Sequence, residues 1–205
     1  MHGRTRSMAL CGLSIALLSV GAAIQVPLGA IPFTLQTLML FLLLLVLTPA
    51  EAVAAVGGYL VLGAVGLPVF SGLRGGFGVL LGPTGGFLLG YLVAALLVVL
   101  LRVLFVRWEL GPRLAVALDV LLVAVAAIVY YAAGTWWFAF STDTSLPAAL
   151  AACVLPFLVP DVVKAAAAFA CAKPIRVALG RTAPGGHRHR PVLPSESPSE
   201  SDAGR

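Results

Sequence analysis

Charged side chains are scarce in this chain. Only 10% of its 205 residues are charged, whereas 60% are hydrophobic. Because about a quarter of the residues in a soluble domain carry charge, this composition excludes an ordinary soluble domain and indicates an integral membrane protein. Cysteine is scarce as well, and Cys11, Cys153 and Cys171 all lie in apolar surroundings. We therefore expect small core residues at these positions rather than a disulfide set.

Motifs for catalysis and metal binding are also missing from the sequence. It has no G-x-x-x-x-G-K-[ST] segment, and therefore no P-loop with which to hydrolyse ATP. It also has no H-E-x-x-H segment and no serine–base arrangement, and the two histidines of "HRHR" in the basic tail are too few for a metal site. We expect no enzymatic activity, no cofactor and no bound metal.

Long apolar runs fill most of the chain. A transmembrane helix needs about 20 mostly apolar residues. On this basis the sequence predicts an all-α membrane protein with six spans, at residues 8–24, 35–47, 52–67, 85–105, 114–131 and 160–179. The apolar segment 146–159 is short for a span, so we expect a packed or partly re-entrant approach to the last span. Pro160 would then lie in the first turn of that span, and one continuous, proline-kinked helix is the alternative.

The basic residues predict the orientation. If the N-terminus is cytoplasmic, all but two of the 13 Lys and Arg residues fall on the inner side, with Arg74 outside and Lys164 within a span. Because cytoplasmic loops carry the excess of Lys and Arg, we expect both termini in the cytoplasm. The net charge of +5 then reflects topology and not nucleic-acid binding. Residues 1–7 would form a cytoplasmic N-terminus, 8–181 the transmembrane domain and 182–205 a disordered cytoplasmic tail.

Two charged residues stand inside the last predicted span. Asp161 and Lys164 are three residues apart, so on a helix they share one face and can pair. A charge within the bilayer costs about 2.5 to 3.5 kcal/mol on insertion scales, which makes such residues candidates for function. The pair would lie in the first turn of the last helix, on the outer side. Either it holds the polar groups of a small ligand, or it only caps the helix and extends to the interface.

Neutral polar residues follow the first span. Thr34, Gln36 and Thr37 enter the second span after a loop that is rich in proline and glycine. Their hydroxyl and amide groups offer donors and acceptors that suit an amide-like or ureido-like ligand. For Thr34, capping of the helix is an equally good interpretation.

A glycine-rich segment precedes the fourth predicted span. Gly78, Gly82, Gly86 and Gly90 are spaced by four, which favours close helix packing. Pro83 argues against an unbroken helix, so we expect residues 75–84 to form a folded-back hairpin. Irregular backbone at membrane depth is tolerated only where it is buried in protein or lines a cavity. The segment therefore predicts a cavity or a tight helix contact, and glycine would let a ligand touch the backbone.

Four segments carry a resemblance to a known family: "IPFTLQTL", "GYLVLGAVGLPVFSG", "GVLLGPTGGFLLGY" and "LPFLVPDVVKA". They resemble the BioY family, the biotin-specific substrate-binding S-components of energy-coupling factor (ECF) transporters. The resemblance runs from the first helix to about Leu179. It implies an S-component bundle of six transmembrane helices that takes up extracellular biotin as its transported substrate. Biotin would lie near the extracellular side under the first loop, and a scaffold (T) subunit and ATPase subunits would be partners.

The resemblance also implies roles for particular residues. Asp161 and Lys164 match the acidic and basic positions of the family's P-x-D-x-x-K element, which reaches the ligand's polar groups. The family's GPTGG wall of the site corresponds to Gly82, Pro83, Thr84, Gly85 and Gly86. Phe87 stands where the family commonly has tyrosine, so a hydroxyl contact there is lost or moved to Tyr91. Gly12 and Ala16 have the spacing of the small residues with which the first helix docks on the scaffold subunit.

Two other functions remain open on the sequence alone. One is an S-component for another small vitamin, which would share the architecture but would not be expected to share both GPTGG and PDVVK. The other is a small membrane enzyme or assembly factor that uses the Asp161–Lys164 pair.

Overall fold

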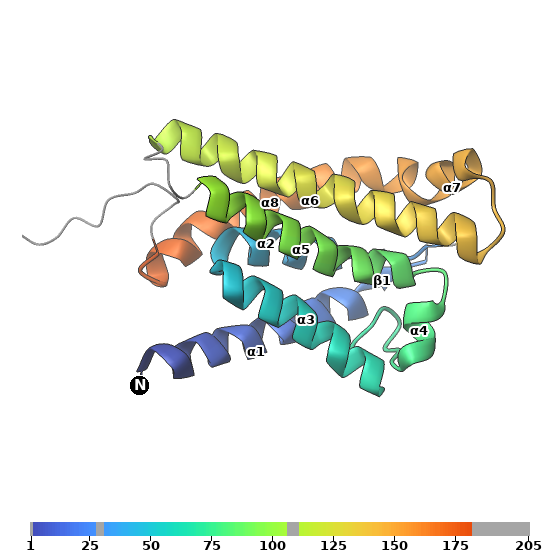
Figure 1. The fold of residues 1–205 in the computed structure, drawn as a ribbon, viewed down its shortest axis with the longest axis horizontal. Helices are drawn as coiled ribbons and strands as arrows, with labels where there is room; N and C mark the ends of the chain where they lie inside the picture. Colours follow the sequence, from blue (N-terminus) through green and yellow to red (C-terminus); the bar gives the residue numbers. More distant parts are fainter. Residues whose placement is uncertain (1, 28–30, 106–110, 182–205) are drawn as a thin grey trace, which may run out of the picture.

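The computed structural model describes residues 2–27, 31–105 and 111–181, and the predicted tail lies outside these residues. The described chain is mostly helical (Figure 1). Its helices are α1 (His2–Ala23), α2 (Gln36–Val46), α3 (Pro49–Val65), α4 (Phe77–Leu81), α5 (Gly85–Phe105), α6 (Pro112–Ser141), α7 (Leu146–Cys153) and α8 (Leu155–Ala178). The strands β1 (Gln25–Val26) and β2 (Phe33–Thr34) pair antiparallel in the first loop.

Four of these helices, α1, α5, α6 and α8, are long and apolar enough to cross a membrane. The structure therefore agrees with a multi-pass membrane protein. Helices α2 and α3 coincide closely with the second and third predicted spans, but they have only 11 and 17 residues. Each is shorter than the about 20 residues that a straight span needs.

Several predicted boundaries were wrong. Helix α1 already begins at His2, so most of the segment 1–7 continues the first helix. Helix α6 runs to Ser141, ten residues beyond the predicted end of the fifth span. Gly134 lies inside this helix, and a side chain there would overlap the ring of Phe87. It is therefore a site of close packing between helices rather than a helix terminator.

Pro160 does not begin the last helix. Helix α8 starts at Leu155, with Pro156 in its first turn and Pro160 inside it. A proline in the first turn removes no intrahelical hydrogen bond, which explains why Pro156 suits the helix start. The chain is interrupted instead at Val154, where α7 ends. The segment 146–159 is therefore not part of one continuous helix. It forms α7, which packs against α6 and α8 as a packed approach to the last helix would, and the first turn of α8.

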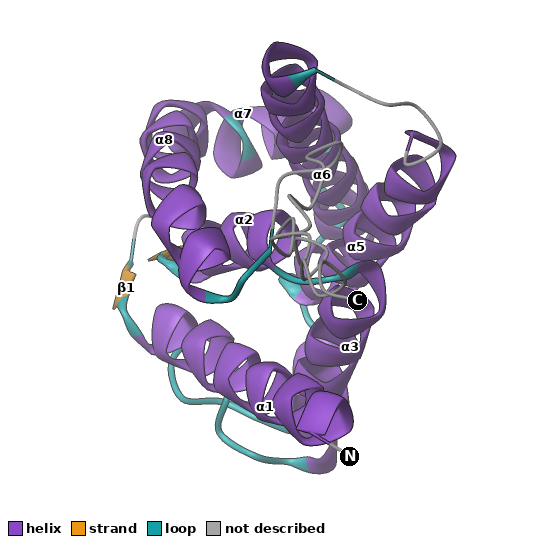
Figure 2. Cartoon of the chain, turned by 90° about the vertical axis from the view of Figure 1, so that its left-hand side faces the viewer, coloured by secondary structure: helices purple, strands orange, loops and turns teal. Residues whose placement is uncertain are grey.

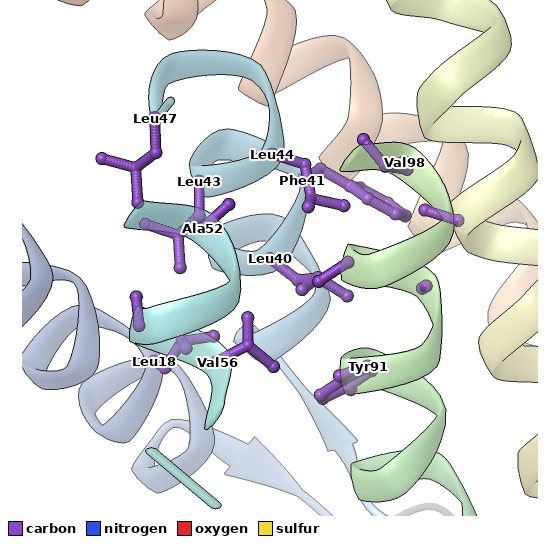
Figure 3. Close-up of a cluster of buried hydrophobic side chains, with 14 of the residues drawn as sticks. Leu18, Leu40, Phe41, Leu43, Leu44, Leu47, Ala52, Val56, Tyr91 and Val98 are labelled. Carbon is purple, nitrogen blue, oxygen red and sulfur yellow. The ribbon is translucent and has the colours of Figure 1, made fainter. Parts of the chain in front are cut away.

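Helix α2 lies in the middle of the bundle (Figure 2). It contacts α1, α3, α5, α6 and α8, and α5 packs along α6. A helix that is apolar on all sides is expected to be buried, and the sequence "LMLFLLLLV" gives α2 that character. Figure 3 shows Leu40, Phe41 and Leu44 of α2 packing with Val56 of α3 and Val98 of α5.

Arginine side chains cap the C-terminal end of α2. Helix ends leave carbonyl groups without intrahelical partners, and cations are favourable beside them. Arg176 donates to the carbonyl oxygen of Leu45 from Nε at 2.8 Å, and Arg181 donates to Val46 at 2.9 Å. Arg102 donates to Leu47 at 3.2 Å. These bonds explain how so short a helix can end inside the protein.

Two carboxylates hold these arginines in place. Asp119 of α6 pairs with Arg102 at 3.4 Å and with Arg176 at 2.6 Å, and Glu51 of α3 pairs with Arg181 at 2.7 Å. We call these five residues the inner network. They join α3, α5, α6 and α8 with the chain just after α8, around the end of α2.

The glycine segment folds differently from the predicted hairpin. It contains the short helix α4, followed by a turn at residues 82–84. The glycine stripe, the four glycines spaced by four from Gly78 to Gly90, has different surroundings along its length. A side chain at Gly86 would meet Trp137 of α6 at 2.1 Å, and one at Gly90 would meet Tyr130 at 3.0 Å, whereas Gly78 has open space around it. Only the part of the stripe within α5 makes the tight helix contact.

The cysteines differ in their surroundings. Cys153 is buried, as predicted, whereas Cys11 is half-buried and Cys171 is exposed on the surface of the bundle. The prediction of three core residues is therefore right for Cys153 alone. Cys171 lies in an apolar stretch of α8, but on a face of the helix that the rest of the bundle does not cover.

Candidate ligand-binding cavity

A cavity opens at the end of the bundle that carries β1, α4 and α7 (Figure 1). Its empty volume is about 630 Å³, including the open mouth. Ligand pockets for small molecules typically have about 300 to 1,000 Å³, so the size suits a small molecule. Its walls come from β2, α2, α4, α5, α6, α7, α8 and the turn after α3. The first residue of α1 and the last turns of α8 lie at the opposite end of the molecule.

Asp161 and Lys164 form an ion pair in the wall of this cavity, as their spacing predicts. Lys164 Nζ lies 2.7 Å from Asp161 Oδ1, and the two residues are 6% and 7% exposed. Thr37 of α2 donates to the same carboxylate oxygen at 3.0 Å and accepts from Lys164 at 2.9 Å. Lys164 also lies 4.0 Å from the centre of the Phe33 ring, in the geometry of a cation–π contact. Lys164 is therefore turned into the protein.

Two tyrosines of α6 complete the surroundings of Asp161. Tyr131 donates to Asp161 Oδ2 at 2.7 Å, and Tyr130 donates to the same oxygen. Together with Thr37 and Lys164 they give the carboxylate four hydrogen-bond donors, about as many as a carboxylate accepts. Asp161 is thus held firmly and holds Lys164 in turn.

The tyrosine pair was missed because the fifth span was predicted to end there. A signal for it exists in the sequence. The chain has only four tyrosines, and Tyr91, Tyr130 and Tyr131 all line the cavity. The fourth, Tyr59 of α3, accepts a hydrogen bond from Gln36 Nε2 at 2.8 Å and donates to Val69 O. Hydroxyl groups in apolar helices need buried partners, so tyrosines there point toward a polar site.

Thr34 and Gln36 both line the cavity, as expected. Gln36 is buried, and the bond to Tyr59 fixes its side-chain amide. Thr34 Oγ1 accepts from the backbone N–H of Gln36 at 3.4 Å, at the start of α2. Thr34 therefore fits both interpretations of the sequence, the helix-end contact and the cavity wall.

The GPTGG residues contribute unequally to the cavity, since only Thr84 among them lines it. Thr84 lines it, together with Phe87, Leu88 and Tyr91 of α5. Gly82, Pro83, Gly85 and Gly86 are not among the lining residues. Instead Gly82 and Pro83 form the turn before α5, and Gly85 and Gly86 begin α5. Gly82 O accepts from Trp137 Nε1 at 2.9 Å, and a side chain at Gly85 would overlap Leu80 O at 1.8 Å.

Gly12 and Ala16 lie away from this cavity. Both are exposed on α1, and a side chain added at Gly12 would meet no other atom within 4 Å. This face of α1 is open to a close contact with another helix. Within the described residues, no three His, Cys, Asp or Glu side chains come close enough to hold a metal ion.

An apolar bundle that encloses a small cavity with a buried ion pair defines a membrane-embedded ligand-binding protein. The BioY family model matches residues 1–181, and this chain therefore belongs to the BioY family. The family membership predicted from the four sequence segments is confirmed.

Curated relatives agree with this membership. The chain is 36% identical over 167 residues to a "Probable biotin transporter BioY" of Pyrococcus horikoshii, with 80% of this chain and 93% of the relative covered. It is 34% identical over 160 residues to "Biotin transporter BioY2" of Lactococcus lactis subsp. cremoris, covering 78% and 84%. It is 47% identical over 96 residues to "Biotin transporter BioY" of Thermotoga maritima, and that match spans 47% of this chain and 57% of the relative.

A solved structure shares the fold. It is the crystal structure of an S-component for biotin from an ECF-type ABC transporter, which superposes with a TM-score of 0.75 at 22% sequence identity. The match covers 89% of this chain and 95% of that chain. At this level of identity the likeness establishes the S-component fold.

Proposed function

We propose that this chain is a biotin-binding S-component, which captures extracellular biotin in the cavity for uptake across the membrane. The observation that carries the proposal is the buried Asp161–Lys164–Thr37 group in the cavity of a chain whose family relatives are named biotin transporters. Membership of a transporter family also favours transport over the alternative of a membrane enzyme. Biotin would then be the transported substrate and not a cofactor.

The site suits a ureido group, which has one carbonyl acceptor and two N–H donors. Lys164 has three N–H bonds, and the contacts with Asp161 and Thr37 use two of them. The third would donate to the ureido oxygen. Gln36 already donates from its amide nitrogen to Tyr59, so its Oε1 would accept from a ureido N–H. The apolar wall of Phe87, Leu88 and Phe157 would cover the rest of the ligand.

Binding of biotin to the purified protein in detergent tests this proposal. Wild-type protein should bind biotin and should not bind unrelated vitamins such as thiamine at the same concentrations. Preferential binding of another vitamin would favour the alternative S-component. Absence of biotin binding by folded protein would contradict the proposed function.

The proposed topology has six spans, with both termini in the cytoplasm and the cavity open to the outside. The inner network and the exposed Lys173 lie at the end opposite the cavity, whereas Arg74 lies at the cavity end. This distribution of positive charge supports the orientation. Labelling of Ser71→Cys or Ser141→Cys in intact cells, in a background without native cysteines, tests it. If these sites are labelled only after the cells are opened, they face the cytoplasm, and the proposed orientation is wrong.

The proposed partners are the scaffold (T) subunit and the ATPase subunits of an ECF transporter. The open face of α1 around Gly12 and Ala16 supports docking, because small residues allow two helices to approach closely. Gly12→Leu should leave biotin binding intact and reduce copurification with the scaffold subunit and biotin uptake. Unchanged uptake and copurification would mean that docking uses another surface.

A further inference from the structure

Arg74 occupies a defined position in the wall of the cavity. It ends a tight turn after α3, in which Phe70 and Arg74 form an antiparallel bridge: Phe70 N donates to Arg74 O at 2.9 Å, and Arg74 N donates to Phe70 O at 3.3 Å. Between them Gly72 and Leu73 have positive φ angles of 75° and 54°. A positive φ is costly for leucine, so the turn keeps this conformation against a local penalty.

Two further contacts fix the turn at the mouth of the cavity. Ser71 Oγ donates to Gln25 Oε1 of β1 at 2.5 Å, which ties the turn to the first loop. Arg74 Nε donates to Ser71 O at 3.0 Å. These contacts direct the guanidinium group while its two terminal nitrogens make no hydrogen bond to the described part of the chain.

Arg74 is a cation without a counterion in the described structure. Lys164, Arg102, Arg176 and Arg181 each pair with a carboxylate within 4.0 Å, but Arg74 does not. Asp161 is the acidic residue in the cavity wall, and it is already paired with Lys164. The charges of the wall therefore leave one uncompensated positive charge, which belongs to Arg74 at the mouth. A planar guanidinium with free N–H groups matches a carboxylate.

We propose that Arg74 binds the carboxylate of the ligand, so that the cavity selects a monoanion whose neutral polar head lies at Lys164. This inference rests on the proposed function, since biotin carries a ureido ring at one end and a carboxylate at the other. The two ends of biotin would then contact two different cations. Lys164 would contact the ureido ring, and Arg74 would contact the carboxylate.

The test compares two ligands, biotin and its uncharged methyl ester, by calorimetry with purified protein. Wild-type protein should bind biotin about 10-fold more tightly than the ester. This factor lies at the lower end of the range for a charge-assisted hydrogen bond, because Arg74 is exposed and solvent weakens its interaction with the carboxylate. Arg74→Gln should bind both ligands equally, at the affinity of the ester. Arg74→Lys keeps the charge and should retain part of the preference.

Lys164→Met is the matched control, because it should weaken both ligands by the same factor and leave the preference for the anion intact. Arg74→Gln removes an exposed side chain, so its melting temperature should equal that of wild type. Equal affinity of wild type for the two ligands would overturn the inference. A preference that survives in Arg74→Gln would also overturn it and would leave Arg74 as a contact to lipid phosphate. Failure of wild type to bind either ligand would instead overturn the proposed function.

Discussion

Replacing Lys164 with methionine removes the charge of the cavity's ion pair and keeps most of the apolar length of the side chain. In the structure, Lys164 Nζ donates to Asp161 at 2.7 Å and to Thr37 at 2.9 Å, which leaves one N–H for a ligand. The variant therefore separates the functional interpretation of the pair from a purely structural one. It changes the group that is proposed to contact biotin and leaves the rest of the wall in place.

The loss of biotin affinity follows from a single bond. A hydrogen bond with a charged donor contributes about 1.5 to 3 kcal/mol, so Lys164→Met should weaken biotin binding by about 10- to 150-fold. Breaking a buried ion pair typically destabilises a protein by about 3 to 5 kcal/mol. The cost here should be smaller, because Asp161 keeps the hydroxyl donors of Thr37, Tyr130 and Tyr131. The variant should therefore remain folded.

Calorimetry with biotin and thermal unfolding in detergent measure the two quantities separately. Lys173→Met is the matched control, since Lys173 lies on the same helix but is exposed and has no ion pair within the described residues. This control should bind biotin as wild type does. Equal biotin affinity in Lys164→Met and wild type would refute the reasoning and leave the ion pair with a structural role only.

Two further substitutions test the packing and the inner network. Gly86→Leu should destabilise the protein by about 1 to 3 kcal/mol or more, because even a Cβ atom there would lie 2.1 Å from Trp137. Gly78→Leu is the control and should be tolerated, because Gly78 has open space around it. Thermal unfolding compares the two variants, and equal melting temperatures would contradict the tight α5–α6 contact. Asp119→Asn removes the carboxylate that two arginines share and should cost about 3 to 5 kcal/mol, whereas Asp143→Asn, in an exposed turn, should leave stability unchanged. A similar melting temperature for Asp119→Asn and wild type would mean that the inner network does not stabilise the bundle.

Local rules of the sequence predicted the features that depend on neighbouring residues. Apolar runs located the long helices, and α5 has the predicted bounds, 85–105. The i,i+3 spacing of Asp161 and Lys164 predicted an ion pair, which the structure contains. Such features are predictable because residues three apart on a helix are close whatever the rest of the chain does.

Contacts between distant segments were beyond these rules. Thr37 and Asp161 are 124 residues apart in sequence, and Asp119 and Arg176 are 57 apart. The sequence predicted that the arginines lie on the cytoplasmic side, but it did not indicate that they cap α2. The break at Val154 was missed because Pro160 was taken as the first-turn proline of the last helix. Pro156 holds that position, and Pro160 lies inside the helix.

The dimensions of α2 explain why polar groups lie deep at both ends of the bundle. At 1.5 Å per residue, an 11-residue helix extends over about 16 Å, roughly half of the hydrocarbon core of a membrane. Both ends of α2 therefore need polar partners from other parts of the protein, because polar groups at membrane depth are costly without them. Helix α8 supplies partners at both ends: Asp161 and Lys164 meet Thr37, and Arg176 meets Leu45 O. The polar cavity wall and the inner network are two consequences of burying one short helix against a long one.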